Sequence, residues 1–179
     1  MLLSICIPTR NHAESLRASL ISIVSQKEFA NRNDIEIVVS DNASTDCTQR
    51  IVDSVAQNFR SKIIYKRNLK NKFDRNFEIA LNHGRGDFLK LANDSLQWQS
   101  GSLAKLIDVV EETKDTKPQL VFTNTNAGTD DLALVKNADE LLKSASYYLT
   151  WIGSFGIWKS DLDELDNFSR YASLHLVVV

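Results

Sequence analysis

Polar side chains that could bind a charged group follow three apolar segments of this chain. The segment SICIP is followed by Thr9-Arg10-Asn11, IEIVV by Ser40-Asp41-Asn42, and FLKLA by Asn93-Asp94-Ser95. Carboxylates accept hydrogen bonds and bind cations, amides both donate and accept, and a guanidinium group pairs with two oxygens of a phosphate. Three segments that each end in such a cluster indicate one shared binding rim.

Strand-like and helix-like segments alternate along the chain and would bring these clusters together. Apolar runs rich in β-branched residues are separated by segments with apolar residues at helical spacing. Helices are predicted from Asn11 to Gln26, from about Thr48 to Asn58, through Ala80, and from Ser100 or Ser102 onward. This order predicts an α/β fold with a mostly parallel sheet covered by helices on both faces. Such sheets bind ligands at the carboxyl ends of their strands, where the three clusters lie.

Composition limits the class of protein. A chain of 179 residues with 43% apolar and 25% charged residues is typical of one soluble domain, which we expect to span 1–179. The net charge of −2 argues against a nucleic-acid binder. We expect no transmembrane segment and no signal peptide. Cys6 and Cys47 have neither the spacing of a disulfide framework nor that of metal ligands, which favours a location in the reducing cytoplasm. The three histidines are scattered along the chain and are interpreted as structural.

Several common nucleotide-binding and hydrolase motifs are missing. The sequence has no G-x-G-x-x-G after its first strand, no G-x-x-x-x-G-K-[ST] and no G-x-S-x-G. Their absence argues against the usual glycine-rich dinucleotide-binding loop, a P-loop and a nucleophile elbow. A nucleotidyltransferase would share the sheet topology, but it normally carries a basic, glycine-rich loop where this chain has PTRNHAES.

Three longer stretches resemble the family 2 inverting glycosyltransferases, which have the GT-A fold. LSICIPTRNHAESLRASLISIVSQ is similar to the opening strand, P-T-x-N turn and first helix of that family. IEIVVSDNASTDCTQRIV resembles its second strand and D-[GN]-[AS]-S-x-D-x-T turn, and NLKNKFDRNFEIALNHGRGDFLKLANDSL resembles the stretch that leads to its D-x-D segment. The resemblance is close over about the first 100 residues.

This resemblance implies transfer of a sugar, with inversion, from a nucleoside diphosphate donor to a saccharide or lipid-linked acceptor. The expected context is bacterial surface polysaccharide, such as capsule, made in the cytoplasm or at the inner face of the plasma membrane by a peripheral enzyme. A UDP-sugar is favoured because the family uses the position of Asp41 to accept a hydrogen bond from the N3–H group of uracil. The alternative is a module that binds nucleotide sugar with little or no transferase activity.

The implied site consists of residues that also have ordinary structural interpretations. Asn11 could be the N-cap of the first helix, with Glu14 completing a capping box. Asp41 and Asn42 could form an Asx-turn, and Arg75 could pair along its helix. The full set of nucleotide-sugar-binding candidates is Pro8, Thr9, Arg10, Asn11, Asp41, Asn42, Arg75, Asn93 and Asp94.

The chain departs from the family at the metal position. The last Asp of D-x-D coordinates a divalent cation, Mn²⁺ or Mg²⁺, and alignment places Ser95 there, with Asp94 in the middle and Asn93 first. A serine hydroxyl is a poorer ligand for a hard cation than a carboxylate. Three alternatives stay open at this point: Asp94 takes the ion from a shifted register, the cation is held weakly, or no metal is needed. A plain Asx-type turn is the structural alternative.

The catalytic base is the second departure. Inverting transfer needs a carboxylate to deprotonate the acceptor hydroxyl, and the family supplies it after a G-x-F-type stretch. GSFGIWKSDLDELD matches that stretch weakly and offers Asp161, Asp163 and Asp166 as candidates, although they resemble an ordinary polar helix face. The chain ends in SLHLVVV, which we interpret either as a strand cut short or as a chain that lacks the acceptor-binding half usual in the family.

Overall fold

The computed structural model describes residues 1–122, 139–140, 143, 152–154 and 156–165. Strands and helices alternate as expected over the first 113 of these positions. In chain order the elements are β1 (Leu3–Thr9), α1 (Ala13–Val24), α2 (Lys27–Asn31), β2 (Ile35–Asp41), α3 (Thr48–Ala56), β3 (Ile63–Arg67), α4 (Arg75–Asn82), β4 (Phe88–Leu91), α5 (Ser102–Thr113), the 3₁₀ turn η2 (Ile152–Ser154), β5 (Gly156–Trp158) and α7 (Lys159–Glu164).

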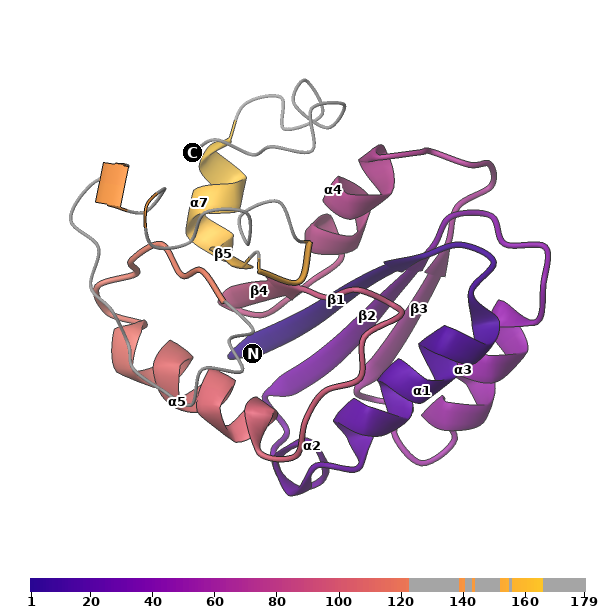
Figure 1. The fold of residues 1–179 in the computed structure, drawn as a ribbon, viewed down its shortest axis with the longest axis horizontal. Helices are drawn as coiled ribbons and strands as arrows, with labels where there is room; N and C mark the ends of the chain where they lie inside the picture. Colours follow the sequence, from indigo (N-terminus) through magenta and orange to yellow (C-terminus); the bar gives the residue numbers. More distant parts are fainter. Residues whose placement is uncertain (123–138, 141–142, 144–151, 155, 166–179) are drawn as a thin grey trace.

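The five strands form one sheet in the order β3-β2-β1-β4-β5 (Figure 1). The first four strands are parallel, and β5 runs antiparallel to β4. Thr9, the last residue of β1, pairs with Asp41, the last residue of β2. Because neighbouring parallel strands point the same way, the segments after β1, β2 and β4 emerge at the same edge of the sheet, as the sequence predicted.

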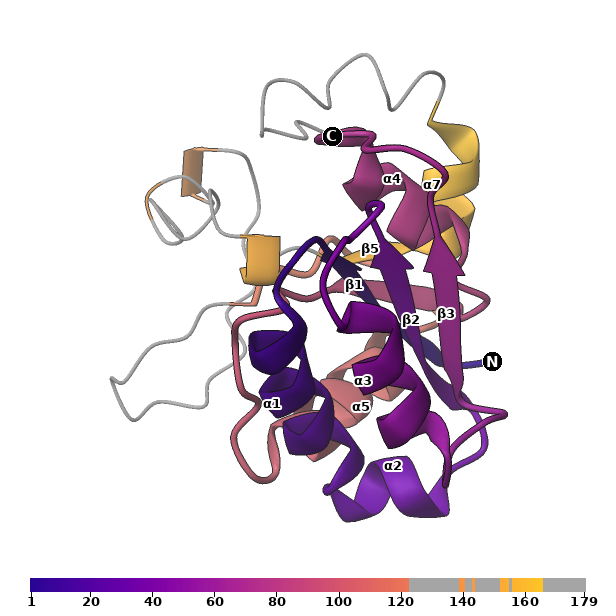
Figure 2. The same cartoon turned by 90° about the vertical axis from the view of Figure 1, so that its right-hand side faces the viewer.

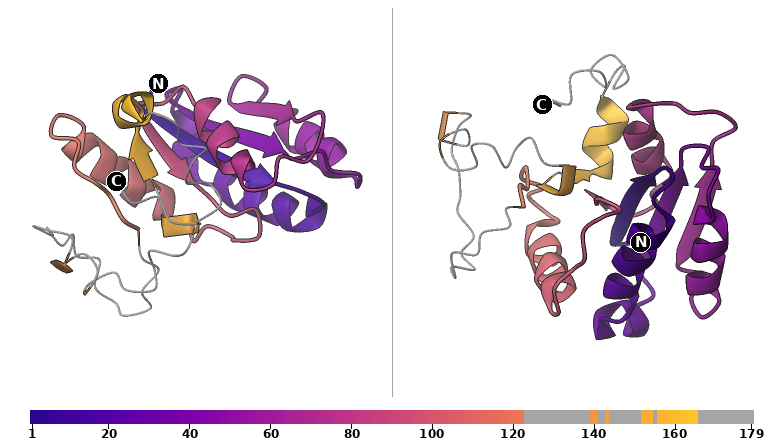
Figure 3. Two further views of the ribbon diagram at one scale, coloured as in Figure 1. Left: turned by 90° about the horizontal axis from the view of Figure 1, so that it is seen from above. Right: turned by 45° about the vertical axis from the view of Figure 1, so that its right-hand side comes forward.

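Helices cover both faces of this sheet (Figures 2 and 3). On one face, apolar side chains of α1, α2, α3 and α5 pack against alternate residues of the central strands, including Ile5 and Ile37. On the other face, α4 and α7 pack against the intervening positions, including Cys6 and Val38. All residues of β1 and β2 are buried, which explains why these strands read as continuous apolar runs.

Hydrogen bonds around a buried carboxylate hold the turn before β4 close to β1. Glu36 is fully buried in β2 and accepts hydrogen bonds from Ser4 Oγ at 2.7 Å and from Arg85 Nε at 2.8 Å. The backbone N–H of Gly86 donates to the same serine hydroxyl at 2.7 Å. A Cβ on Gly86 would lie 2.5 Å from the backbone nitrogen of Ser4, so only glycine allows the turn to come this close to β1.

Several boundaries differ from the expectations. The first helix ends at Val24 and the short helix α2 follows it, whereas one helix through Gln26 was predicted. The segment QLVFTN after Pro118, residues 119–124, also predicts a strand by its apolar residues, but residues 119–122 contain only an isolated bridge at Val121. Among the described residues, none of the helices has the length and apolar composition that a bilayer crossing requires.

Candidate functional site

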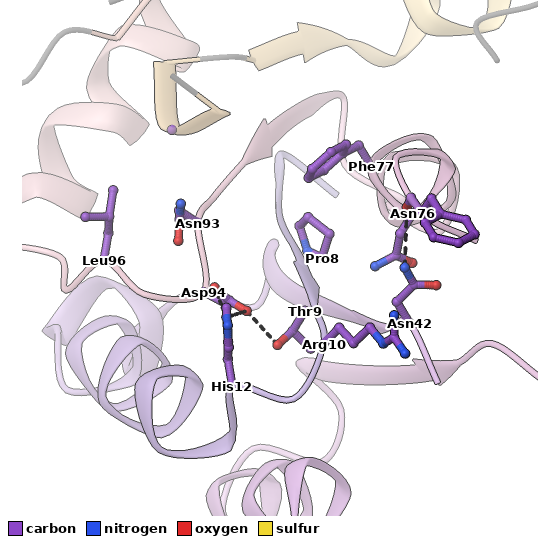
Figure 4. Close-up of a pocket in the computed structure, with 12 residues that line it drawn as sticks. Pro8, Thr9, Arg10, His12, Asn42, Asn76, Phe77, Asn93, Asp94 and Leu96 are labelled. Carbon is purple, nitrogen blue, oxygen red and sulfur yellow. Dashed lines mark hydrogen bonds and ion pairs between the residues drawn. The ribbon is translucent and has the colours of Figure 1, made fainter. Parts of the chain in front are cut away.

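A cavity of about 640 Å³ lies at the carboxyl ends of β1, β2 and β4 (Figure 4). Its volume is within the usual range for a small-molecule site. Most of its lining comes from the segments that follow these strands and from α4 with the loop before it. The lining residues are Pro8, Thr9, Arg10, His12, Asn42, Phe73, Asn76, Phe77, Asn93, Asp94, Leu96 and Gly153.

Asp94 contacts three other side chains at one wall of this pocket. Its Oδ2 accepts a hydrogen bond from Thr9 Oγ1 at 2.7 Å, and its Oδ1 accepts one from Ser95 Oγ at 3.0 Å. The Nδ1 atom of His12 lies 3.1 Å from Oδ2 and 3.3 Å from Oδ1. The Asp94 side chain is 10% exposed and that of His12 is 58% exposed, so the pair has a buried acidic end and an open basic end.

An asparagine network shapes the opposite wall of the pocket (Figure 4). Asn42 Nδ2 donates to Asn71 Oδ1 at 2.7 Å, and Asn42 Oδ1 accepts from the backbone N–H of Lys72 at 2.6 Å. At the start of α4, Asn76 Nδ2 donates to the backbone carbonyl of Ser40 at 2.9 Å. These bonds tie the loop before α4 to the end of β2 and place Phe73 at the pocket.

A buried lysine supports the third wall. Lys90 of β4 donates from Nζ to the carbonyls of Leu91, at 3.0 Å, and of Gly153, which lines the pocket. Burial lowers the pKa of Lys90 to about 7, since water no longer stabilises its charged form. The amine therefore joins the η2 turn to β4 from inside the protein.

Asp41 does not line the pocket, so the expectation that Thr9, Asp41 and Asp94 share one cavity is wrong for Asp41. Its carboxylate is 1% exposed and accepts hydrogen bonds from Tyr65 Oη and from the backbone N–H of Ser44, the latter at 2.8 Å. Burial and the hydrogen bond to Asp41 raise the pKa of Tyr65 above its ordinary value. Asp41 thus closes the turn after β2 from within, and the neighbouring Asn42 faces the cavity.

Asn11 is not the helix cap that the sequence suggested. It has a φ of 54° and accepts a hydrogen bond from the backbone N–H of Thr45 at 2.8 Å. His12 occupies the N-cap position without a side-chain cap bond, and the first-turn N–H of Ala13 instead donates to Asp46 at 3.1 Å. The cap therefore comes from the turn after β2, and Asn11 joins two turns and does not line the pocket.

The two candidate arginines lie in different places relative to the cavity. Arg10 lines the cavity as expected, whereas Arg75 lies outside it at the exposed first position of α4. Arg75 approaches Glu78 at 4.0 Å, one helical turn away, as in the structural alternative. Pro8, Thr9, Asn42, Asn93 and Asp94 also line the cavity. Sequence reasoning missed His12, Phe73, Asn76 and Phe77.

The family model for glycosyl transferase family 2 matches residues 4–165. This span contains the whole sheet except Leu3, and every residue that lines the pocket. The chain belongs to glycosyl transferase family 2.

Two curated relatives of this family 2 chain are bacterial glycosyltransferases. Abequosyltransferase RfbV of Salmonella typhimurium is 44% identical over 138 residues, which are 76% of this chain and 40% of that protein. The GalNAc(5)-diNAcBac-PP-undecaprenol β-1,3-glucosyltransferase of Campylobacter jejuni is 31% identical over 111 residues, which are 62% of this chain and 35% of that protein. The chain therefore spans well under half the length of each relative.

Solved structures of similar fold include glycosyltransferases with bound donors, and the mostly parallel sheet predicted for the GT-A fold is confirmed. The mannosyltransferase PcManGT of Pyrobaculum calidifontis, in complex with GDP-Man and Mn²⁺, has a TM-score of 0.64 at 19% identity, covering 90% of this chain and 45% of that one. S. aureus TarS 1–349 in complex with UDP-GlcNAc has a TM-score of 0.60 at 20% identity, covering 76% and 39%.

Of the three residues that the sequence aligns with the D-x-D segment, Asn93 and Asp94 line the cavity and Ser95 does not. The backbone N–H of Ser95 donates to Asn93 Oδ1 at 2.8 Å, as in an Asx-turn. Asp94 does face the cavity, and His12 is the neighbouring side chain with a possible ligand atom. The described residues contain no group of three or more histidine, cysteine or acidic side chains, so a cation here would have at most two such ligands and would take further oxygens from the ligand.

The expected base candidates lie away from the pocket. Because β5 is antiparallel to β4, Trp158 at its carboxyl end pairs with Phe88 at the amino end of β4. Helix α7 therefore begins at the edge of the sheet opposite the pocket. Asp163 pairs with Lys159 at 3.1 Å and Asp161 accepts from Ser160 at 3.2 Å, and neither lines the cavity. The role of these two as the base therefore stays a prediction that the geometry of the cavity does not support, and the third candidate, Asp166, lies outside the described residues.

The contacts of Asp41 predict a structural role that a stability measurement can detect. Tyr65→Phe removes one hydrogen-bond donor from a buried carboxylate and should lower the free energy of unfolding by about 1–3 kcal/mol in urea titration. Thr116→Val removes a hydroxyl whose bond to the carbonyl of Thr113 is exposed, and should change it by less than about 0.5 kcal/mol. Equal effects of the two changes would mean that the tyrosine hydroxyl does not support Asp41.

Proposed function

We propose that this domain transfers a sugar, with inversion, from a nucleoside diphosphate donor to an acceptor of bacterial surface-polysaccharide assembly. The observation that carries the proposal is the pocket at the carboxyl ends of the parallel strands, where Arg10, Asn42 and Asp94 meet. Family membership and the two curated relatives, both bacterial transferases, support the reaction class. Donor binding without transfer is the competing outcome.

The donor diphosphate would lie between Arg10 and the Asp94 wall. A guanidinium group can donate two hydrogen bonds to phosphate oxygens, and a cation held by Asp94 would neutralise the remaining charge. That cation, Mn²⁺ or Mg²⁺, supplies Lewis-acid stabilisation of the leaving diphosphate when bound. In this arrangement Thr9 and His12 keep the carboxylate oriented toward the cavity.

The nucleoside would lie on the side of Asn42, Asn76 and Phe73. Amide groups can read the edge of a base or the ribose hydroxyls, and an aromatic ring can stack on a base. We retain UDP as the proposed nucleotide, since a neighbour of the same fold binds UDP-GlcNAc. Another neighbour binds GDP-Man, so the test compares both bases. With Asp41 enclosed, Asn42 is the residue at the end of β2 that faces the cavity, so it would lie beside the base.

A lipid-linked acceptor would bring this domain to the membrane surface, and one loop suits that contact. In the segment before α4, Leu69 is 102% exposed. Lys70 and Lys72 follow it in the sequence. An exposed apolar side chain beside two cations fits an anionic lipid surface, into which the apolar group inserts while the amines meet the headgroups. The same loop borders the pocket, so the acceptor would arrive beside the donor.

Nucleotide binding tests the proposed donor site. A 100-fold excess of UDP over its Kd, with Mn²⁺ present, should raise the Tm by roughly 5–10 °C because the nucleotide binds only the native state. Arg10→Ala should weaken UDP binding at least about tenfold in calorimetry through loss of a charged hydrogen-bond donor. Arg17→Ala removes an exposed arginine of α1 outside the pocket and should leave the affinity unchanged.

Three results would revise or contradict this account. Tighter binding of GDP than UDP would change the assigned base and leave the site in place. Equal loss of affinity in the Arg10→Ala and Arg17→Ala variants would show that the nucleotide does not use this pocket. Donor binding without any transfer or hydrolysis would favour the binding module.

Co-sedimentation with vesicles tests the membrane contact. We expect the protein to bind vesicles that contain anionic phospholipid, and Leu69→Ser to reduce the bound fraction several-fold because it removes an inserted apolar group. Ile21→Ser changes a 41% exposed apolar residue on α1 and should have no effect. Unchanged binding of the Leu69→Ser variant would exclude this loop as the contact.

A further inference from the structure

His12 and Asp94 form a pair of possible metal ligands that the sequence pattern does not identify. They come from different parts of the chain, 82 residues apart, and both line the cavity. Their closest atoms, His12 Nδ1 and Asp94 Oδ2, are 3.1 Å apart. Thr9 Oγ1 holds Oδ2 from the β1 side, which leaves the imidazole and the carboxylate facing each other at the pocket rim.

This separation matches the spacing of two adjacent ligands of an octahedral ion. Ligand atoms at about 2.1 Å from a cation and at right angles to each other lie about 3.0 Å apart. A cation could therefore replace the proton between Nδ1 and Oδ2 with little movement of either side chain. The neutral tautomer with its proton on Nε2 presents the Nδ1 lone pair that such a bond requires.

Ser95 is a poor alternative for the second ligand. Its hydroxyl donates to Asp94 Oδ1 at 3.0 Å, its backbone closes the turn with Asn93, and it does not line the cavity. His12 is open to solvent and makes no side-chain bond that caps α1, so its ring is available to an incoming ion.

We propose that His12 is the second protein ligand of the divalent cation and takes the place of the carboxylate missing at position 95. The inference rests on the proposed function, since the donor diphosphate would complete the oxygen shell. An imidazole nitrogen suits Mn²⁺ better than Mg²⁺, which prefers oxygen ligands alone. With His12 in place of a carboxylate, the site would therefore bind Mn²⁺ in preference to Mg²⁺.

Electron paramagnetic resonance of Mn²⁺ bound together with UDP tests this assignment without measuring activity. The parent protein should show electron spin-echo modulation from a directly bound ¹⁴N nucleus, which changes on ¹⁵N-histidine labelling. His12→Ala should abolish that modulation and weaken Mn²⁺ binding in the presence of UDP at least about tenfold. His83→Ala, which removes a histidine at the end of α4 and outside the pocket, should retain both.

The possible outcomes distinguish a failure of this inference from a failure of the proposed function. UDP-dependent Mn²⁺ binding without nitrogen modulation would overturn the role of His12 and leave the donor site intact. UDP binding that is independent of Mn²⁺ would also overturn it. Failure of UDP and GDP to bind, with or without Mn²⁺, would contradict the proposed function and this inference together.

Discussion

The hydrogen bond from Thr9 to Asp94 is the contact on which the pocket depends. It joins the ends of β1 and β4 across 85 residues of sequence, and its acceptor is a carboxylate that is only 10% exposed. A buried carboxylate is costly unless donors surround it, and here two hydroxyl groups and an imidazole do so. The charge is thereby held at the rim with one side open to a ligand.

The direction of each strand decides which polar residues lie near the Asp94 carboxylate. The parallel register brings the segments after β1, β2 and β4 to one edge, so Arg10, Asn42 and Asp94 surround one cavity. The antiparallel edge strand β5 carries the acidic residues of α7 to the other edge. A pocket is thus formed within the described residues of this family 2 domain, and Asp161 and Asp163 of α7 do not line it.

The β-branched runs and their polar ends were sufficient to predict the parallel sheet, its helical layers and the place of the pocket. They could not show which of Asp41 and Asn42 faces the cavity, because β2 ends at Asp41 and the regular alternation of side chains stops there. Helix capping also escaped prediction, since Asp46 reaches Ala13 from another turn. A lone histidine carries no local signal, and only the tertiary contact with Asp94 shows that His12 belongs to the site.

A crystal structure of the protein with UDP and Mn²⁺ tests the central claim most directly. The account predicts density for the diphosphate between Arg10 and Asp94, the nucleoside beside Asn42 and Phe73, and the cation on Asp94. The Thr9–Asp94 hydrogen bond should persist in the complex. Nucleotide bound at the opposite edge of the sheet, near the start of β4 and α7, or a diphosphate without contact to the Asp94 wall, would contradict the account.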